Sequence, residues 1–195
     1  MAHKGLEAEL RDARANPTFL EEARRLAPFR TIPVLVDQGR AMGDSNAISH
    51  WLDREYPKGP RLWPDGEDAA DALQIAALVD VALNHLVDVG TRYYALREHP
   101  AWDNVKKEML GRAERALDAL GERVSSLRNA PVARSGWSAA DMWLYTLVAW
   151  IEGLPARARV NPTIAQVLSL GVGLPNSLSK WADAHRDRAD VRGLD

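Results

Sequence analysis

Residues 31–57 read TIPVLVDQGRAMGDSNAISHWLDREYP, and this stretch holds the clearest structural signals in the chain. Residues 32–36 are rich in β-branched side chains, a turn signal with aspartate and glycine follows, and a second short segment returns after it. Two such segments joined by a tight turn predict a β-hairpin over residues 32–42. Asp44 and Ser45 then open a helix whose apolar residues share one face.

The sequence on either side of this stretch differs in periodicity. On the N-terminal side, apolar and charged residues alternate over residues 6–10, which predicts a strand, and residues 18–26 predict a short helix. Residues 2–6 are typical of the end of an earlier helix, with Gly5 as its left-handed stop. On the C-terminal side no strand signal appears from residue 65 onward. The helices expected there cover residues 72–89, 105–127, 139–153, 163–170 and 176–188.

This change in pattern predicts two domains. We expect an α/β domain over residues 1–60, a linker over 61–66 and an all-α domain over 67–195. The helix beginning after Ser138 is apolar nearly all round, which predicts a central place in a helical bundle. Ser138 and Asp141 have the spacing of a capping box at its N-terminus.

Composition excludes several classes of protein. The 195 residues include 25 basic and 27 acidic side chains and no cysteine. Such a balance gives no electrostatic reason to expect nucleic acid, and the lack of cysteine excludes disulfides, iron–sulfur clusters and cysteine-based zinc sites in this sequence. The histidines lack metal-ligand spacing, so no metal site is expected. The start lacks the apolar core of a secretory signal, and the longest apolar stretch, around residues 142–151, is shorter than a bilayer span. We therefore expect a cytoplasmic protein without membrane contact.

Two features of the hairpin and its following helix each allow two interpretations. Pro33 is either an ordinary edge proline or a cis-proline that turns the backbone of Ile32 toward an extended peptide ligand. Asp44 and Ser45 either cap the helix or bind a zwitterion. In the second case the helix N-terminus and the Ser45 hydroxyl hold a carboxylate, and Asp44 holds an ammonium group.

Taken together, these motifs resemble the glutathione S-transferase family. The resemblance rests on Thr31–Asp37, Gly43–Ile48, Trp51–Leu52, Tyr56–Pro57, Leu62–Pro64 and the capping box Ser138–Asp141. It implies a thioredoxin-like domain followed by a helical-bundle C-terminal domain, with glutathione as co-substrate and a small hydrophobic electrophile as the second substrate. It also implies a homodimer, for which the two apolar faces of residues 72–89 give an independent reason.

The resemblance also assigns site residues. The backbone of Ile32, before the cis-proline Pro33, pairs with the cysteinyl part of glutathione, and Asp44 and Ser45 hold its γ-glutamyl end. Thr31 occupies the position where many members carry a lysine or glutamine for the glycine carboxylate, and Arg30 is the alternative for that role.

Compared with the family, the thioredoxin-like domain is expected to be truncated at its N-terminus. We expect the family's first strand and most of its first helix, which carries the Tyr, Ser or Cys that activates the thiol, to be absent from the chain as given. Two explanations are open. Either the start was assigned at an internal methionine or the chain is a fragment, which we favour, or the protein is a true short form without the activating residue. The chain as given is therefore expected to bind glutathione weakly and to turn over little.

Three functions remain open at this point. The first is a glutathione transferase that detoxifies electrophiles, and the second is a glutathione-dependent isomerase, dehalogenase or ether-cleaving enzyme. The third is a non-catalytic binding or interaction module with the same fold. The intact binding motif favours the first two, whereas the missing activating residue favours the third.

Overall fold

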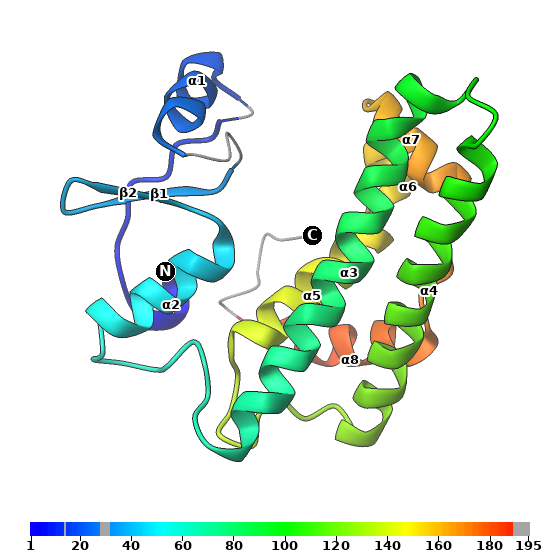
Figure 1. The fold of residues 1–195 in the computed structure, drawn as a ribbon. Coiled ribbons are helices and arrows are strands. Elements are labelled where there is room, and N and C mark those ends of the chain that lie inside the picture. Colours follow the sequence, from blue (N-terminus) through cyan, green and yellow to red (C-terminus); the bar gives the residue numbers. More distant parts are fainter. Residues whose placement is uncertain (14, 28–31, 189–195) are drawn as a thin grey trace. The chain divides into compact units, whose positions relative to one another are not determined.

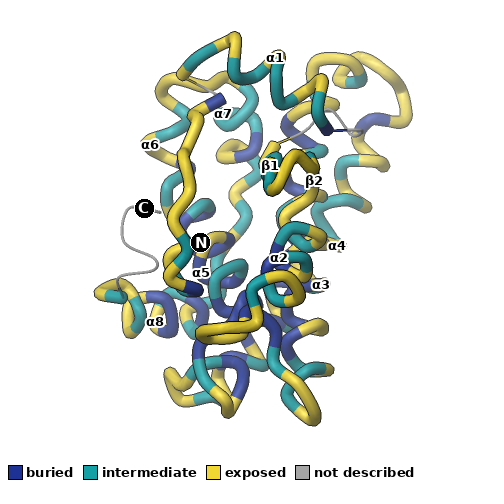
Figure 2. Tube along the Cα trace, turned by 90° about the vertical axis from the view of Figure 1, so that its left-hand side faces the viewer, coloured by how far each residue is buried: buried dark blue, intermediate teal, exposed yellow. Residues whose placement is uncertain are grey.

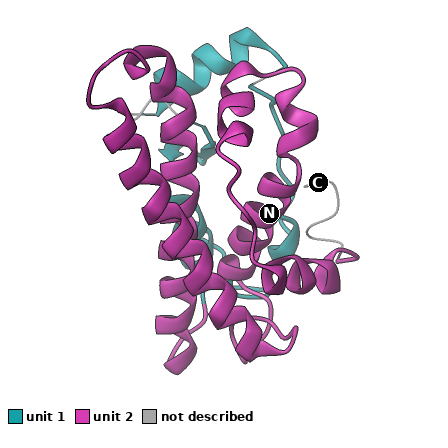
Figure 3. Cartoon of the chain, turned by 90° about the vertical axis from the view of Figure 1, so that its right-hand side faces the viewer, with its two compact units in different colours: residues 1–63 teal, residues 64–195 magenta. Residues whose placement is uncertain are grey.

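A computed structural model describes residues 1–13, 15–27 and 32–188. The chain divides into two compact units, Met1–Trp63 and Pro64–Asp195, which Figure 3 draws in two colours. The division lies inside the segment expected to be a linker. Each unit is described here by itself.

Unit 1 contains short helices and one hairpin (Figure 1). Its elements are η1 (Ala2–Lys4), α1 (Pro17–Leu26), β1 (Val34–Asp37), β2 (Arg40–Gly43) and α2 (Ser45–Glu55). The two strands pair antiparallel, with Val34 opposite Gly43 and Asp37 opposite Arg40. The predicted hairpin and the predicted helix over residues 18–26 are thus confirmed. Gly5 ends η1 with a φ of 65°, as expected of a left-handed stop.

The strand expected over residues 6–10 is wrong. This segment forms no strand, and the sheet in the described part of the chain consists of β1 and β2 alone. Figure 2 shows the segment as mostly exposed, and Leu10 is 89% exposed. Alternation of apolar and charged residues creates a strand only where a neighbouring strand supplies hydrogen bonds and a buried face, and residues 6–10 have neither.

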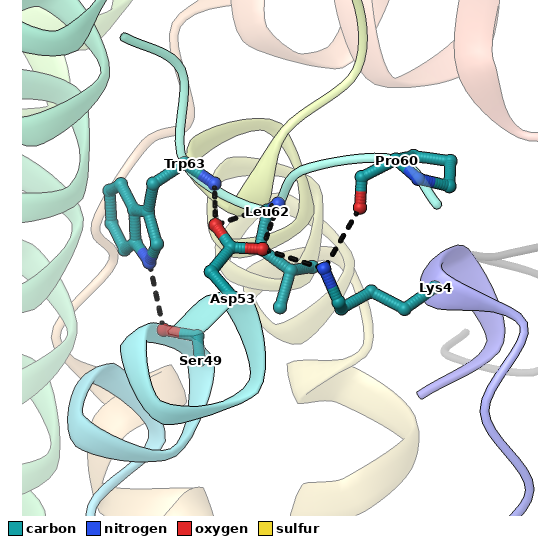
Figure 4. Close-up of polar contacts among 6 residues, drawn as sticks. All are labelled: Lys4, Ser49, Asp53, Pro60, Leu62 and Trp63. Carbon is teal, nitrogen blue, oxygen red and sulfur yellow. Dashed lines mark hydrogen bonds and ion pairs between the residues drawn. The ribbon is translucent and has the colours of Figure 1, made fainter. Parts of the chain in front are cut away.

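The N-terminus of unit 1 is fastened to α2 by a buried ion pair (Figure 4). The ammonium group of Lys4 lies 2.8 Å from Oδ1 of Asp53 and donates to the carbonyl oxygen of Pro60 at 3.2 Å. The amides of Leu62 and Trp63 donate to the same carboxylate at 2.8 Å each. Burial alone would raise the pKa of Asp53, but these donors and the Lys4 ammonium outweigh it and lower the pKa. Asp53 therefore joins η1, α2 and the end of the unit.

Unit 2 is all-helical in its described residues. Its helices are α3 (Glu67–Leu96), α4 (Trp102–Leu127), α5 (Ala139–Glu152), α6 (Leu154–Ala158), α7 (Pro162–Ser169) and α8 (Asn176–His185). Helix α6 was not expected, because the sequence predicted one helix ending at residue 153 and the next beginning at residue 163. Proline near a helix N-terminus costs no hydrogen bond, so Gly153 and Pro155 also begin this helix.

The most apolar helix, α5, has nine buried residues, and its N-terminus is held by a buried capping box. Oδ2 of Asp141 accepts from the Ser138 amide at 2.9 Å and from the Ser138 hydroxyl at 2.7 Å. Oδ1 accepts from the Val132 amide at 2.7 Å. Burial raises the pKa of Asp141 despite these three donors. The predicted capping box is confirmed, and it also ties the preceding loop to α5.

Helix α3 contains a longer predominantly apolar segment than residues 142–151, the stretch singled out from the sequence. Its 30 residues are long and apolar enough to cross a membrane by length and composition. One such helix is weak evidence for a membrane span, because the core helix of a bundle meets the same criteria. Eight of its residues are buried within unit 2, where α3 packs against α4, α5 and α7.

The contact between α3 and α7 depends on a glycine. A Cβ atom added at Gly90 would lie 2.7 Å from Cγ2 of Val167 and 3.0 Å from the carbonyl oxygen of Thr163. We expect Gly90→Ala to lower the free energy of unfolding by roughly 1–3 kcal/mol through overpacking. In the matched control Gly111→Ala, the added atom would meet only the flexible end of Arg115, at 3.2 Å. That variant should gain about 0.5–1 kcal/mol from helix propensity. Denaturant titration of both variants measures this, and shifts of the same sign would contradict the packing argument.

Candidate glutathione site

The hairpin register brings the sequence-predicted site residues to one end of unit 1. Val34 opposite Gly43 is the last pair of the ladder, so Pro33 and Asp44 are the next residues on the two strands. The Ile32–Pro33 peptide is cis, as predicted. Ile32 and Pro33 on one strand and Asp44 on the other therefore lie at the same, open end of the hairpin.

Ile32 presents both its side chain and its backbone at this end. Its side chain is 41% exposed. No described residue forms a hydrogen bond with its backbone N–H or carbonyl group. An exposed backbone at the start of a strand can pair with an extended peptide. Thr31 and Arg30, considered for the glycine carboxylate, lie outside the described residues.

Asp44 caps helix α2. Its Oδ1 accepts from the amide of Ala47 at 3.0 Å, and its φ of 75° is a conformation that aspartate and asparagine tolerate better than most residues. Its second carboxylate oxygen accepts no hydrogen bond from the described part of the chain, and the residue is exposed. The structure thus shows that Asp44 caps α2, and it leaves the second carboxylate oxygen of Asp44 exposed to solvent.

Ser45 is the first residue of α2 and is exposed. The first N–H groups of a helix have no acceptor within it and carry partial positive charge, which suits a carboxylate. The Ser45 hydroxyl has no partner among the described residues. Whether Ser45 and Asp44 hold a ligand stays a prediction.

A carboxylate at the opposite, turn end of the hairpin was missed by sequence reasoning. Asp37, interpreted only as part of a turn, accepts at Oδ2 from Nε1 of Trp51 at 3.0 Å and at Oδ1 from the hydroxyl of Tyr56 at 2.8 Å. These hydrogen bonds hold the pKa of Asp37 below its ordinary value, and Asp37 in turn raises the pKa of Tyr56. The available signal was an aspartate at a strand end followed by a Trp and a Tyr, whose polar tips seek partners.

A histidine and a group of aromatic residues in unit 2 make contacts within their own unit. His85 bonds through Nδ1 to the carbonyl oxygen of Val81 at 2.8 Å, which fits a structural histidine. Tyr93 lies edge-on to Tyr94 and Trp102, with Trp102 buried. Over the described ranges, no group of three or more potential metal-ligating side chains comes together.

The family model that matches the chain is that of the glutathione S-transferase N-terminal domain, over residues 1–55. A glutathione S-transferase of Hypomyces subiculosus is 46% identical over 48 residues, which cover 25% of this chain and 23% of that protein. A probable glutathione S-transferase, GSTU1, of Oryza sativa subsp. japonica is 34% identical over 105 residues, covering 51% of this chain and 46% of that protein. The chain thus matches less than half the length of these curated relatives.

Solved structures show the same fold. A glutathione transferase family member from Pseudomonas fluorescens with bound glutathione has a TM-score of 0.62 at 21% identity, covering 93% of this chain and 80% of that one. A glutathione S-transferase from Anopheles dirus has a TM-score of 0.59 at 22% identity, covering 93% and 84%.

The fold is that of a thioredoxin-like domain, with a small two-stranded sheet, followed by a helical glutathione S-transferase C-terminal domain. The family model over residues 1–55, the curated relatives and the solved structures agree in one respect, which is that the chain is similar to glutathione S-transferases.

Proposed function

We propose that the chain binds glutathione at the open end of the hairpin, through the Ile32 backbone, Asp44 and Ser45. The observation that carries this proposal is the β1–β2 register, which puts the cis Ile32–Pro33 peptide beside Asp44 at the N-terminus of α2. The glutathione-bound relative of the same fold supports the same ligand class.

The three groups suit different parts of the ligand. The γ-glutamyl end of glutathione is a zwitterion, with a carboxylate for the α2 N-terminus and the Ser45 hydroxyl and an ammonium for the outward oxygen of Asp44. The cysteinyl part is an extended peptide, and the unpaired backbone of Ile32 offers it a donor and an acceptor.

The proposal extends to glutathione as co-substrate. The glutathione thiolate forms a carbon–sulfur bond with a small hydrophobic electrophile, either by adding to a polarised double bond, whose other carbon then takes up a proton, or by displacing a leaving group that departs with the bonding electrons. A hydrogen-bond donor or helix N-terminus near the sulfur keeps the thiolate ionised at neutral pH. We also propose that the protein is a cytoplasmic homodimer with neither a nucleic acid nor a membrane as partner. The exposed apolar residues of α3, among them Leu73, Val81 and Val87, support an association surface. Sedimentation at micromolar concentration tests the dimer, and a monomer would contradict it.

The charge of Asp44 can be separated from its capping role. In Asp44→Asn the amide oxygen can still cap α2 and asparagine still tolerates the positive φ, but the negative charge is gone. We expect this variant to keep its stability and to lose roughly 1–3 kcal/mol of glutathione binding, the scale of a charge-assisted hydrogen bond. Asp44→Ala should lose the same binding energy and, in addition, about 1 kcal/mol of stability with the cap.

Calorimetric titration with glutathione and with N-acetylated glutathione measures this effect. Acetylation removes the ammonium group, so the unmodified chain should bind the acetylated ligand more weakly, and Asp44→Asn should hardly distinguish the two ligands. Equal glutathione affinity of the unmodified and Asp44→Asn chains would overturn the assignment of Asp44. A lack of binding by the unmodified chain would overturn the proposed function.

A further inference from the structure

One carboxylate ties the turn end of the hairpin to the C-terminal half of α2. Asp37 is the last residue of β1, and its two donors lie at the end of the second turn of α2 and at its C-cap. Each carboxylate oxygen receives one donor, Trp51 Nε1 at 3.0 Å and the Tyr56 hydroxyl at 2.8 Å. The contact spans 14 and 19 residues along the chain, so it fixes the relation of two elements and not a local turn.

Two arginines complete this contact. The guanidinium carbon of Arg40 lies 4.6 Å from the centre of the Trp51 ring, and that of Arg54 lies 5.1 Å from it. Arg40 is also the ladder partner of Asp37. Cations over the indole favour the orientation in which its N–H donates to the carboxylate, because they hold the ring between β2 and the last turns of α2.

We propose that Asp37 is a positioning residue for the glutathione site, which it holds in its binding geometry from the far end of the hairpin. This inference rests on the proposed function. Asp37 does not touch the ligand. It acts through Trp51 and Tyr56 on the angle between the hairpin and α2.

The reason is geometric. The ligand groups are divided between two elements, since Ile32 and Pro33 precede β1 while Asp44 and Ser45 belong to the N-terminal end of α2. The chain joins hairpin and helix directly only at Gly43–Asp44–Ser45. Packing of β2 against α2 and the position of Arg40 over Trp51 already restrain the angle between the two elements. The Asp37 contact adds the hydrogen bonds that fix the turn end of the hairpin to the helix, so it bears on the distance between the Ile32 backbone and the α2 N-terminus.

The carboxylate is suited to the task at neutral pH. The two donors lower the pKa of Asp37, so the ionised form that accepts both of them predominates. The charged groups that face this contact are the two guanidinium groups over Trp51 and, beside Arg54, the carboxylate of Glu55 at 3.0 Å.

The expected effect is a rise in the dissociation constant for glutathione. If loss of the contact leaves between about a tenth and a third of molecules with the competent angle, Asp37→Ala binds roughly three- to tenfold more weakly. Trp51→Phe and Tyr56→Phe each remove one donor and should produce smaller increases. Asp37→Asn keeps one acceptor oxygen and should recover part of the affinity lost in Asp37→Ala.

The matched control is Ser49→Ala. Ser49 lies on the same helix, accepts from Nε1 of the buried Trp63 at 3.0 Å and donates to the Asn46 carbonyl oxygen at 2.7 Å, so its loss lowers stability, including within the first turns of α2, without touching the hairpin. Glutathione titrations of all variants are made well below their unfolding temperatures. Amide hydrogen exchange of residues 43–47 without ligand gives a second readout, and exchange should accelerate more in Asp37→Ala than in Ser49→Ala.

The outcomes distinguish the two proposals. Weaker binding confined to the Asp37, Trp51 and Tyr56 variants, with faster exchange than in Ser49→Ala, supports positioning. If the unmodified chain binds glutathione and Asp37→Ala binds it equally well, or if exchange at residues 43–47 is unchanged, Asp37 has only a structural role and the inference is overturned. If the unmodified chain does not bind glutathione, the proposed function fails and the inference fails with it.

Discussion

Replacing Asp141 with alanine is expected to lower the free energy of unfolding by roughly 3–5 kcal/mol, because three buried donors lose their acceptor. The carboxylate is fully buried and accepts three hydrogen bonds, from the Val132 amide and from the amide and hydroxyl of Ser138. Without it, these donors are left in the interior with no acceptor, and each orphaned group costs about 1–3 kcal/mol. The N-terminus of the central helix α5 also loses its cap.

Two further variants grade this effect. Asp141→Asn keeps the side-chain volume and one acceptor oxygen, but its NH₂ group would face the donors of Ser138, so we expect an intermediate loss. Ser138→Ala removes only the hydroxyl, and about 1 kcal/mol should be lost. Denaturant midpoints followed by circular dichroism rank the three variants. A ranking in which Ser138→Ala is as damaging as Asp141→Ala would show that the hydroxyl and not the carboxylate holds the helix end.

Burial also sets the sign of the pH effect at this position. Because the pKa of Asp141 is raised in the folded protein, the native state takes up this proton before the unfolded chain does as the pH falls. The contribution of Asp141 to stability is therefore largest in acid and declines as the pH rises through the folded pKa.

Local sequence signals predicted the parts of this fold that local interactions determine. The hairpin follows from a β-branched run, a turn and a return segment, and the cap of α5 follows from Ser138 and Asp141 three residues apart. The cis peptide at Pro33 was implied by the resemblance of the surrounding motif to the glutathione S-transferase family, since Pro33 alone also allowed an ordinary edge proline. Each of these signals lies within about a dozen residues of chain, where propensity and spacing decide the structure.

Contacts between distant residues could not be predicted in this way. Lys4 and Asp53 are 49 residues apart, and their pairing depends on how η1 returns to α2. Asp37 belongs to a turn by its sequence, yet its partners come from the far half of the next helix. The strand predicted over residues 6–10 failed for the same reason. Apolar and charged residues do alternate there, but in the described residues no second strand lies beside the segment to pair with it, and the local pattern could not show this. For the candidate site, Ile32, Pro33, Asp44 and Ser45 were named from the sequence, and the hydrogen bonds of Asp37 to Trp51 and Tyr56 were not.

Asp53→Ala is expected to destabilise unit 1 by roughly 3–5 kcal/mol, because it leaves a buried cation without its counter-ion. The side chain of Lys4 is only 1% exposed and that of Asp53 7% exposed. After the substitution the ammonium group keeps the Pro60 carbonyl oxygen, and the amides of Leu62 and Trp63 lose their acceptor. The control is Glu21→Gln on α1, whose partner Arg24 is 42% exposed, and there the loss should stay below about 1 kcal/mol.

The double variant Lys4→Met with Asp53→Leu tests whether the charge or the packing matters. It leaves no uncompensated ion in the interior, so it should recover part of the stability lost in Asp53→Ala, although the two amides remain without an acceptor. Amide hydrogen exchange along α2 reports this unit separately from the helical bundle. If the double variant is less stable than Asp53→Ala, the cost does not come from the unpaired cation.

The pH dependence of Asp53 has the opposite sign to that of Asp141. Its pKa in the folded protein lies below the ordinary value of 3.8, so the unfolded chain takes up the proton first as the pH falls. The stability that Asp53 contributes is complete above the unfolded pKa and is lost as the pH falls through the folded one. Protection of α2 should therefore decline below about pH 4 in the unmodified chain more steeply than in Asp53→Asn, which has no proton to take up there. Parallel declines in the two chains would mean that other carboxylates, and not Asp53, govern the acid stability of unit 1.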